Sequence, residues 1–385
     1  MYRIGQEEIE AVARVINAKA LFKINDSLKE TFHAEEEFKA LFKVDHALLM
    51  TSGHAALTSA LVAMGIGPGD EVIVPAYTYI ATAMAVIAAG AIPIVVDIDE
   101  TLTISPKAIE NAINERTKAI IPVHIQGFPC DMTSICEIAK KYGLLVLEDA
   151  CQADGGSFNG KRLGTIGNAG AFSFNYFKVI TAGEGGALVT NDKSIFEKAL
   201  IYHDSSAVAF FGNQLDGVDS LPFCGSEFRT NEIASAILRV QLTRLDGILA
   251  DLRKNKAYIM AALKDCARFA PSNDIDGDCG TTVAFSFDTA QEAIDFATAT
   301  GGVRPFDTGK HVYTNWTPFL QRRGAFHPAM DPFKMKENAN SNPDYTEKAC
   351  PKTLDLLART VYISVNPDDG KAELDALIEK LKKAL

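Results

Sequence analysis

Short apolar runs alternate with longer stretches of helical periodicity along residues 46–150. The apolar runs are continuous, without the polar alternation of a strand that faces water on one side. This alternation predicts a parallel β-sheet with helices on both faces. The predicted strands lie at 46–51, 71–76, 92–99, 118–125 and 144–150. The helices predicted between them lie at 53–65, 79–90, 105–115 and 132–143.

The pattern changes in the C-terminal part of the chain. Residues 231–266 predict one long helix with a charged face. Shorter elements are expected after it at 281–288, 291–301 and 371–385. We therefore predict a large domain over 1–245, with an N-terminal helical segment, and a small α+β domain over 246–385. Residues 325–350 are rich in Pro, Asn and Asp and predict a long loop, which in compact domains is usually functional or disordered.

Composition and charge narrow the class of protein. The chain has 385 residues, 47% of them apolar and 23% charged, as in ordinary globular proteins. Its net charge of -11 argues against nucleic acid or an acidic membrane as the main partner. No apolar run reaches transmembrane length, and residues 1–19 predict an acidic amphipathic helix, not a signal peptide. Seven scattered cysteines favour reduced thiols in the cytoplasm, and we expect no metal site.

Ligands of parallel sheets bind at the carboxyl ends of the strands. Four segments begin where a predicted strand stops, and we expect them to form one site. They read MTSGHAAL, PAYTYIAT, LEDACQADGG and SFNYFKVITAGEGG.

The first segment is a candidate phosphate site. Ser52, Gly53 and His54 stand at a strand-to-helix turn, where the first backbone N–H groups of the helix are unpaired. Gly53 would let an anion approach these groups closely. Alone the signal is weak, because many helices begin this way. The side chain of His54 is more typical of capping or packing than of ligand binding.

Acidic and aromatic side chains follow two other strands. Glu148 and Asp149 end a buried strand, and only one of them faces any given side. The carboxylate at the site needs a cation, a metal or a protonated ring nitrogen, or else it is a structural cap. No cluster with metal-ligand spacing lies nearby. Tyr77 and Tyr79 would offer an aromatic face to a ligand, or simply pack at the rim.

Lys178 lies among aromatic and β-branched residues, between predicted strands at 171–175 and 185–190. A lysine is rarely buried unless its nitrogen is paired or used. In a dry pocket it loses its proton more easily and becomes a nucleophile toward carbonyls. A phosphate cradle, an aromatic plate, an acid and a lysine together fit one cofactor, pyridoxal 5'-phosphate (PLP).

These segments, in this order, resemble the DegT/DnrJ/EryC1/StrS family of sugar aminotransferases. The resemblance runs from about residue 20 to the C-terminus. It implies an α/β protein with the type I aspartate-aminotransferase fold, in which a mostly parallel seven-stranded sheet forms the large domain. It also implies a homodimer with the active site at the subunit interface. The motifs that carry it read TSGHAALTSAL, GDEVIVPAYTYIATAMAVIAAGAIPIVVDID, LEDACQADG, FSFNYFKVITAGEGGALVTND and FRTNEIASAILRVQL.

The resemblance also implies the role of each cofactor-binding residue. The implied roles are the Schiff-base lysine for Lys178, the partner of the pyridine nitrogen for Asp149, the contact to the ring hydroxyl for Gln152, phosphate binding for Ser173 and for the backbone of Gly53 and His54, and ring stacking for Tyr79.

Two positions depart from the family pattern. His54 stands where the family usually has threonine, so a hydroxyl contact to the phosphate is lost or replaced. Glu227, in GSEFRT, stands where an asparagine of the neighbouring subunit often reaches the phosphate. A carboxylate would repel a phosphate dianion. Either Ser226 or another group takes the role, or Glu227 turns away.

The implied reaction moves an amino group from glutamate to a keto or aldehyde sugar, in amino-sugar synthesis for a surface polysaccharide or lipopolysaccharide. Lys178 would transfer the proton. Residues 310–333 differ from the usual nucleotide-sugar pattern. The chain as a whole resembles the family members that aminate an octulosonic acid aldehyde at C8, which implies that acceptor. The alternative is a nucleotide-linked hexose aminated at C3 or C4. For a carboxylate of either substrate we expect arginines: Arg229, Arg322 and Arg323 are the candidates, although the last two also suit a solvated loop.

Two other functions remain possible within this resemblance. Some relatives are sugar 3-dehydratases in which histidine replaces the lysine, and the presence of Lys178 argues against that reaction. A PLP-binding regulatory protein without turnover is the alternative of another class. The complete set of cofactor residues argues against it.

Overall fold

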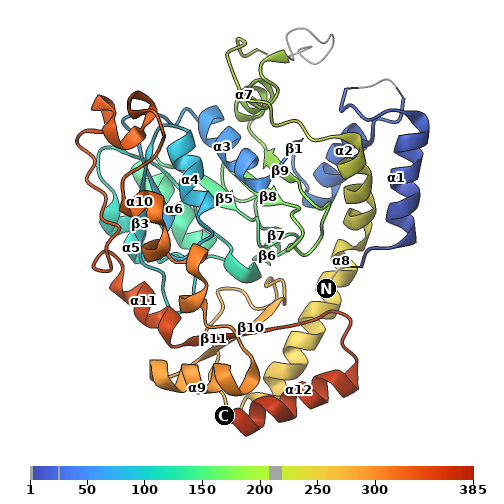
Figure 1. Cartoon of the computed structure of the whole chain (residues 1–385), viewed down its shortest axis with the longest axis vertical. Helices are drawn as coiled ribbons and strands as arrows, with labels where there is room; N and C mark the ends of the chain where they lie inside the picture. Colours follow the sequence, from blue (N-terminus) through green and yellow to red (C-terminus); the bar gives the residue numbers. More distant parts are fainter. Residues whose placement is uncertain (1–2, 25–26, 208–218) are drawn as a thin grey trace.

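The computed structural model describes residues 3–24, 27–207 and 219–385. Its centre is a seven-stranded sheet in the order β1-β9-β8-β5-β4-β2-β3 (Figure 1). β9 is antiparallel to both of its neighbours, and the other neighbouring strands are parallel. The strands are β1 (His46–Met50), β2 (Glu71–Pro75), β3 (Ile92–Val96), β4 (Thr117–Ile120), β5 (Leu145–Asp149), β8 (Ala169–Ser173) and β9 (Gly186–Thr190). The mostly parallel sheet predicted from the sequence is confirmed.

Helices cover both faces of the sheet, because strand residues alternate between two apolar cores. Leu49 packs in the core of one face, and Leu48 and Met50 pack in the core of the other. The helices of the first face are α2 (Glu30–Phe42), α5 (Pro106–Ala112) and α6 (Met132–Tyr142). The helices of the second face are α3 (Gly53–Ala63), α4 (Ala81–Ala88) and α7 (Lys193–His203). Two of these helices, α2 and α7, were not predicted from the sequence.

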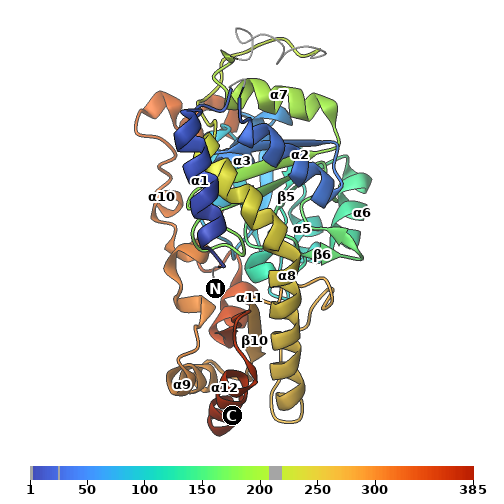
Figure 2. The same cartoon turned by 90° about the vertical axis from the view of Figure 1, so that its right-hand side faces the viewer.

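A single long helix, α8 (Glu232–Leu263), joins the large sheet to the C-terminal part of the chain (Figure 2). Its 32 residues span about 48 Å at 1.5 Å per residue. Its N-terminal half packs against α1 (Gln6–Ala18) and α2. Glu232 accepts hydrogen bonds from the backbone N–H groups of Glu30 and Thr31, at 2.5 and 3.1 Å, and so caps α2. The domain boundary predicted at residue 245 lies inside α8 and stays a prediction.

The C-terminal part is built on a small antiparallel sheet of two strands, β10 (Thr282–Ser286) and β11 (Thr360–Ser364). The helices around it are α9 (Ala290–Thr300), α11 (Pro351–Ala358) and α12 (Lys371–Ala384). The smaller elements of the chain are the hairpin β6 (Ser157–Phe158) and β7 (Lys161–Arg162), the short helix α10 (Thr317–Leu320) and the 3₁₀ turns η1 (Ile125–Gly127), η3 (Pro305–Asp307), η4 (Gly309–His311) and η5 (Tyr313–Asn315). The elements expected at 281–288, 291–301 and 371–385 are confirmed.

Residues 325–350 form a long loop, as predicted, with three 3₁₀ turns, η6 (Pro328–Met330), η7 (Pro332–Lys334) and η8 (Lys336–Asn338). The loop is tied to the β2–β3 edge of the large sheet. The Tyr345 hydroxyl donates to the Pro93 carbonyl at 2.8 Å, and the Asn338 side chain donates to the Gly90 carbonyl at 3.0 Å. The loop therefore packs against the sheet edge and does not cover the cavity described below.

A buried ion pair fixes the turn that precedes β10 to α8. Lys256 of α8 and Asp278 are only 8% and 1% exposed, and the Lys256 Nζ lies 2.7 Å from the Asp278 Oδ2. The backbone of the same turn is held by Arg253, whose Nε donates to the Asp278 carbonyl at 2.7 Å. The next residues, Thr281 and Thr282, reach the cavity, so this pair controls where one of its walls stands.

We predict that Lys256→Met lowers the free energy of unfolding by about 3–5 kcal/mol, because it leaves the buried Asp278 carboxylate unpaired. Urea unfolding followed by circular dichroism measures the change. Lys254→Met, on an exposed position of the same helix, is the matched control. Adding Asp278→Asn to Lys256→Met should recover part of the loss. Equal stability of the two lysine variants would contradict the prediction.

Candidate active site

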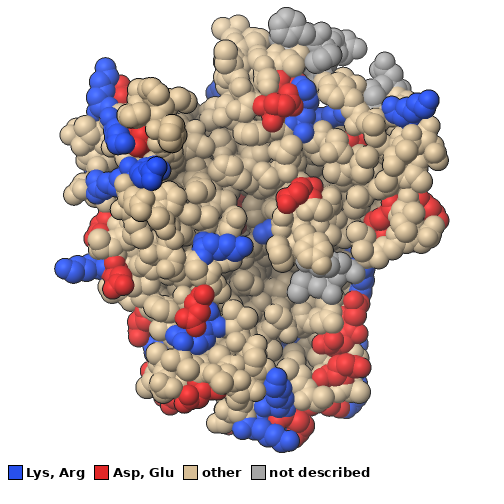
Figure 3. Space-filling view, viewed as in Figure 1, with Lys and Arg blue, Asp and Glu red and all other residues tan. Residues whose placement is uncertain are grey.

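A cavity of about 750 Å³ opens at the carboxyl end of the parallel strands. The space-filling view shows a hollow in the middle of this face (Figure 3). The four strand-end segments predicted to form one site all contribute to it. The residues assigned to PLP binding all line it: Gly53, His54, Tyr79, Asp149, Gln152, Ser173 and Lys178. The opposite wall comes from the C-terminal part, at residues 281–282, 310–311, 364–365 and 367.

Asp149 is held rigidly at the end of β5. Its Oδ2 accepts a hydrogen bond from the Thr82 hydroxyl at 2.7 Å, and its Oδ1 accepts the backbone N–H of Cys151 at 3.1 Å. The Thr82 and Thr78 hydroxyls are 2.7 Å apart, which continues the chain of hydrogen bonds. With an exposed fraction of 4%, the carboxylate is desolvated and has a fixed orientation. It is therefore suited to a cationic partner in the cavity.

Glu148 points to the other side of the sheet. It has the structural capping role that the sequence left open for either of the two acids. Its carboxylate accepts backbone N–H groups from Gly164, Ile166 and Gly167 at 2.6–2.8 Å. The His124 Nε2 lies 3.1 Å away from it. Glu148 is fully buried and fully paired, so it has no role in the cavity.

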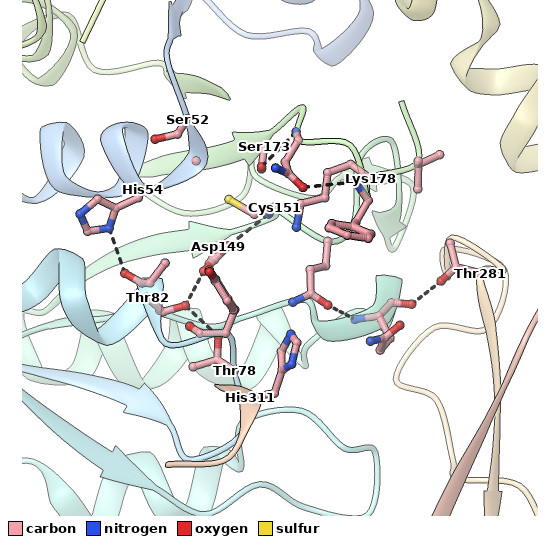
Figure 4. A pocket seen from close by; sticks show the side chains of 18 of the residues that line it. Ser52, His54, Thr78, Thr82, Asp149, Cys151, Ser173, Lys178, Thr281 and His311 are labelled. Atoms are coloured by element: carbon pink, nitrogen blue, oxygen red, sulfur yellow. Dashed lines mark hydrogen bonds between the residues drawn. The ribbon is translucent and has the colours of Figure 1, made fainter. Parts of the chain in front are cut away.

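Lys178 lies in the turn between β8 and β9, and its side chain extends toward Cys151 and Asp149 (Figure 4). The backbone N–H of Lys178 donates to the Asn175 carbonyl at 3.0 Å, which fixes the turn. Asp154, which sequence reasoning left unassigned, lies buried near this lysine. Burial raises the pKa of the Asp154 carboxyl well above its usual range, and the charge of Lys178 opposes that rise. Neither carboxyl oxygen has a hydrogen-bond partner among the described residues.

The turn between β1 and α3 has the shape expected of an anion cradle. The Ser52 hydroxyl accepts the Ala55 N–H at 3.1 Å and caps the helix. Gly53 begins the helix, and a Cβ there would lie 2.6 Å from the Cys151 Sγ and 2.9 Å from the Ser173 Cβ. Only glycine fits this position. The Ser173 hydroxyl receives only a long hydrogen bond of 3.4 Å, from the Asn175 N–H, so its proton is available to a ligand.

His54 lines the cavity, but its imidazole is engaged elsewhere. Its Nδ1 lies 3.3 Å from the Ala81 carbonyl, at the start of α4 (Figure 4). This agrees with the expected packing role of the side chain, and it leaves the backbone N–H as the group that would contact a phosphate.

Gln152 is oriented by a neighbour. Its Oε1 accepts the Gln126 N–H at 3.1 Å, so its amide NH₂ is left to donate into the cavity. The two tyrosines of PAYTYIAT differ in their exposure to solvent. Tyr79 is 41% exposed at the rim of the cavity, whereas Tyr77 is buried in the core, and burial raises the pKa of its hydroxyl.

The wall opposite the sheet carries two groups that sequence reasoning did not assign, Lys310 and His311. The His311 carbonyl accepts the Thr78 N–H at 3.0 Å, so this segment is tied to the loop after β2. Burial, together with the charges of Lys310 and Lys178, lowers the pKa of His311 to about 4. The imidazole is therefore neutral at pH 7. Both residues lie at the start of the stretch 310–333, whose unusual sequence was the only signal.

The arginines proposed for substrate binding do not line the cavity of this chain. The Arg229 guanidinium pairs with Asp204 and, at 2.8 Å, with Glu227. Arg322 donates to the Pro343 carbonyl at 3.0 Å on the outer loop, and Arg323 is exposed beside it. In a single chain these side chains are used or directed elsewhere. Their predicted role stays a prediction that requires another copy of the chain.

Glu227, which raised doubt about the phosphate site, turns toward Arg229. Its carboxylate is thereby neutralised, and neither Glu227 nor Ser226 lines the cavity. Of the alternatives that the sequence left open, the structure of one chain agrees with Glu227 turning away.

The residues present fit PLP. A helix N-terminus with a glycine that no larger residue replaces, a free hydroxyl, a fixed buried carboxylate and a lysine all meet in one cavity. In the described ranges no group of His, Cys, Asp and Glu side chains has the arrangement of a metal site. Over the same ranges no helix is long and apolar enough to cross a bilayer.

Comparison with known proteins agrees with this site. A model of the DegT/DnrJ/EryC1/StrS aminotransferase family matches residues 2–300. GDP-perosamine synthase of Caulobacter vibrioides is 42% identical over 56% of this chain and 57% of its own length. The dTDP-3-amino-3,4,6-trideoxy-alpha-D-glucose transaminase of Streptomyces venezuelae is 40% identical over 62% of this chain and 60% of its own. These two matches thus span less than two thirds of the relatives. The pleiotropic regulatory protein of Geobacillus stearothermophilus is 37% identical, over 69% and 68%.

Solved structures give the same picture for the fold. The structure of 3-amino-5-hydroxybenzoic acid synthase has a TM-score of 0.81 and 28% identity, with 100% of this chain and 97% of that one covered. The structure of S. venezuelae DesV in complex with a ketimine intermediate has a TM-score of 0.75 and 28% identity, with 98% and 94% covered.

The fold is that of the type I PLP-dependent aminotransferases, and PLP is supported as the cofactor by both the fold and the cavity. Within this class, the chain belongs to the DegT/DnrJ/EryC1/StrS aminotransferase family. The family, the fold and the cofactor expected from the sequence are confirmed.

We predict that the His311 imidazole titrates with a midpoint near pH 4, because burial and two nearby lysines oppose its protonation. Nuclear magnetic resonance of protein labelled at histidine measures the midpoint, and His311→Gln assigns the signal. Since the unfolded chain takes up this proton near pH 6.5, the folded state also loses stability as the pH falls from about 6.5 to 4. A midpoint close to the ordinary value would contradict the burial seen here.

Proposed function

We propose that this protein is a PLP-dependent aminotransferase that moves an amino group from an amino acid, glutamate by preference, to a keto sugar. The observation that carries the proposal is the meeting of Lys178, Asp149, Gln152 and Ser173 with the start of α3 in one cavity. They come from three strand ends: α3 begins after β1, Asp149 and Gln152 lie at the end of β5, and Ser173 and Lys178 lie at the end of β8. No packing requirement explains why an acid, a lysine and an anion cradle face the same space.

The chain offers a partner for each part of the cofactor. The N–H groups of Gly53 and His54, with the Ser173 hydroxyl, would hold the phosphate. Asp149 would hold a proton on the ring nitrogen, Gln152 would donate to the ring hydroxyl, and Tyr79 would lie against the ring. When bound, PLP supplies an electron sink and a carbonyl carbon that amines attack.

The remaining tasks belong to the protein's own groups. The amine of Lys178, half-buried and close to Asp149, would take a proton from the amino donor and return it to the acceptor. The Thr82 hydroxyl and the Cys151 N–H keep the Asp149 carboxylate aligned throughout. His311 is neutral and therefore does not compete for the acid or repel the lysine.

For the acceptor, a nucleotide-linked keto-hexose is better supported than the octulosonic acid aldehyde implied by the overall resemblance. Two relatives are named for GDP- and dTDP-linked amino sugars. The name of the Geobacillus relative concerns regulation. A turnover assay with glutamate and a panel of keto-sugars distinguishes an aminotransferase from a PLP-binding regulatory protein without turnover. A place in lipopolysaccharide synthesis and in the cytoplasm stays a prediction.

We also propose that the protein works as a homodimer with the cavity at the interface. Phe177 lines the cavity and is 74% exposed, and its neighbour Tyr176 is 57% exposed. Large aromatic side chains at such exposure beside a catalytic lysine are typical of surfaces that a second subunit covers. A partner subunit would also be the route by which Arg229 or Glu227 reaches a neighbouring site.

We predict that borohydride reduction fixes PLP covalently to Lys178, as shown by the mass of the corresponding peptide. Lys178→Ala should lose this adduct and all detectable turnover, while its circular dichroism stays unchanged. Lys161→Ala, on the exposed hairpin, is the control and should behave as the wild type. An adduct on another residue, or none, would refute the proposed function.

We predict that Gly53→Ala weakens PLP binding about tenfold or more, because its Cβ would collide with Cys151 and Ser173 and displace the anion cradle. A loss of about 1.4 kcal/mol already gives this factor. Titration of the apoprotein with PLP, followed by absorbance, measures it. Gly247→Ala, on α8 where a Cβ meets no atom within 4 Å, is the matched control. Unchanged affinity in Gly53→Ala would mean that the phosphate lies elsewhere.

A further inference from the structure

The cavity extends beyond the residues that we assign to cofactor binding. Beyond them it is lined by Thr281, Thr282, Lys310 and Ser364 of the C-terminal part. Within the described ranges, two lysines and no arginine line the cavity: Lys178 and Lys310. A substrate that enters this side therefore meets one permanent positive charge.

The backbone of Lys310 is fixed by two hydrogen bonds. Its carbonyl accepts the Ile80 N–H and the indole N–H of Trp316, both at 3.1 Å. Trp316 is fully buried, so the attachment point is part of the core. The side chain itself is exposed, and its Nζ lies 5.2 Å from the centre of the Tyr79 ring. A contact of this kind keeps an ammonium group at the rim without neutralising it.

No carboxylate of the cavity competes for this ammonium group. Asp149 is bonded to Thr82 and Cys151, and Glu184 accepts the Asn175 side chain at 2.8 Å. Within the described residues Lys310 forms no ion pair. The imidazole next to it carries no charge at pH 7. Lys310 thus faces the cavity from a fixed backbone position and has no counter-ion. Such a lysine is suited to bind an anionic group of a ligand.

The charge of the whole protein makes this group more significant. With a net charge of -11, the protein repels acidic ligands at long range. An acidic substrate then needs a local cation inside the cavity, and the arginines that were expected to supply it are absent from the cavity of this chain.

We infer that Lys310 is a specificity-determining residue that binds an anionic oxygen group of a substrate at the rim of the cavity. The inference deepens the proposed function and rests on it. The anionic group has two possible sources, the side-chain carboxylate of the amino donor and an anionic group of the sugar acceptor. Lys310 touches the substrate only through this contact and takes no part in proton transfer.

The test compares Lys310→Met, which keeps the apolar stem and removes the charge, with Lys310→Arg, which keeps the charge. Lys336→Met, on the outer loop with a side chain 92% exposed, is the matched control. The half-reaction with glutamate, and with alanine as a donor that lacks the side-chain carboxylate, is followed by cofactor absorbance. The full reaction is then measured with the accepted sugar.

For Lys310→Met we expect KM for one substrate to rise about tenfold or more, with kcat changed little, and Lys310→Arg to restore most of the loss. A rise for glutamate but not alanine identifies the donor carboxylate as the anion. A rise for the sugar alone identifies the acceptor. Equal KM values for both substrates in the Met variant, the control and the wild type would overturn the inference.

A binding measurement keeps the test independent of turnover. Glutarate, a dicarboxylate without an amine, and uridine diphosphate are titrated into the PLP-loaded protein by calorimetry, and the His311 midpoint is followed in parallel. At least one of these probes should bind the wild type more tightly than Lys310→Met and raise the His311 midpoint only in the wild type. Equal binding of both probes to the two proteins overturns the inference, whereas a missing adduct at Lys178 refutes the proposed function instead.

Discussion

The structure depends on one buried carboxylate, that of Asp149, which the sheet holds where water cannot reach it. A charge with 4% exposure is costly unless donors and a cation surround it. Thr82 of α4 and the Cys151 N–H supply the donors, and both follow strands whose carboxyl ends a parallel sheet brings to the same edge. The cation is left for a ligand to supply. The fold thus leaves the Asp149 carboxylate in need of a cationic partner, and Lys178 and the anion cradle are arranged around this carboxylate.

The second lobe turns this exposed edge into a cavity. Helix α8 belongs to both parts, and the Lys256–Asp278 pair locks the start of β10 against it, so Thr281 and Thr282 face the sheet at a fixed separation. On the other side, the 309–313 segment is tied to residues 76–80 by backbone hydrogen bonds. The walls of the cavity are therefore rigid where they meet the cofactor residues. The exposed side chain of Lys310 lies at the rim.

Sequence patterns predicted the sheet and the cofactor residues because both are local. A buried strand reads as a continuous apolar run, and the site residues follow directly after such runs. Elements held by distant partners were missed: α2 is capped by Glu232, some 200 residues away in the chain, and β11 pairs with β10 and, through Tyr362, with Val303. In one chain Arg229 is held by Asp204, which lies 25 positions earlier and is brought to it by folding, and the role of the arginines toward a substrate stays a prediction. Asp154 lies inside one of the four quoted segments and Lys310 begins the stretch 310–333, but no local pattern indicated a role for either side chain.

The two lysines that line the cavity have different surroundings, and this difference suits them to different roles. Lys178 is half-buried and extends toward Asp149 and Cys151, and the buried Asp154 carboxyl, which has no hydrogen-bond partner among the described residues, lies near it. The side chain of Lys310 is exposed to water against the Tyr79 ring, and it forms no ion pair within the described residues. The first environment suits covalent and proton-transfer chemistry, and the second suits attraction of an anion. His311, whose pKa is lowered by both lysine charges, is neutral at pH 7, so it adds no third charge to the two that act on the substrate.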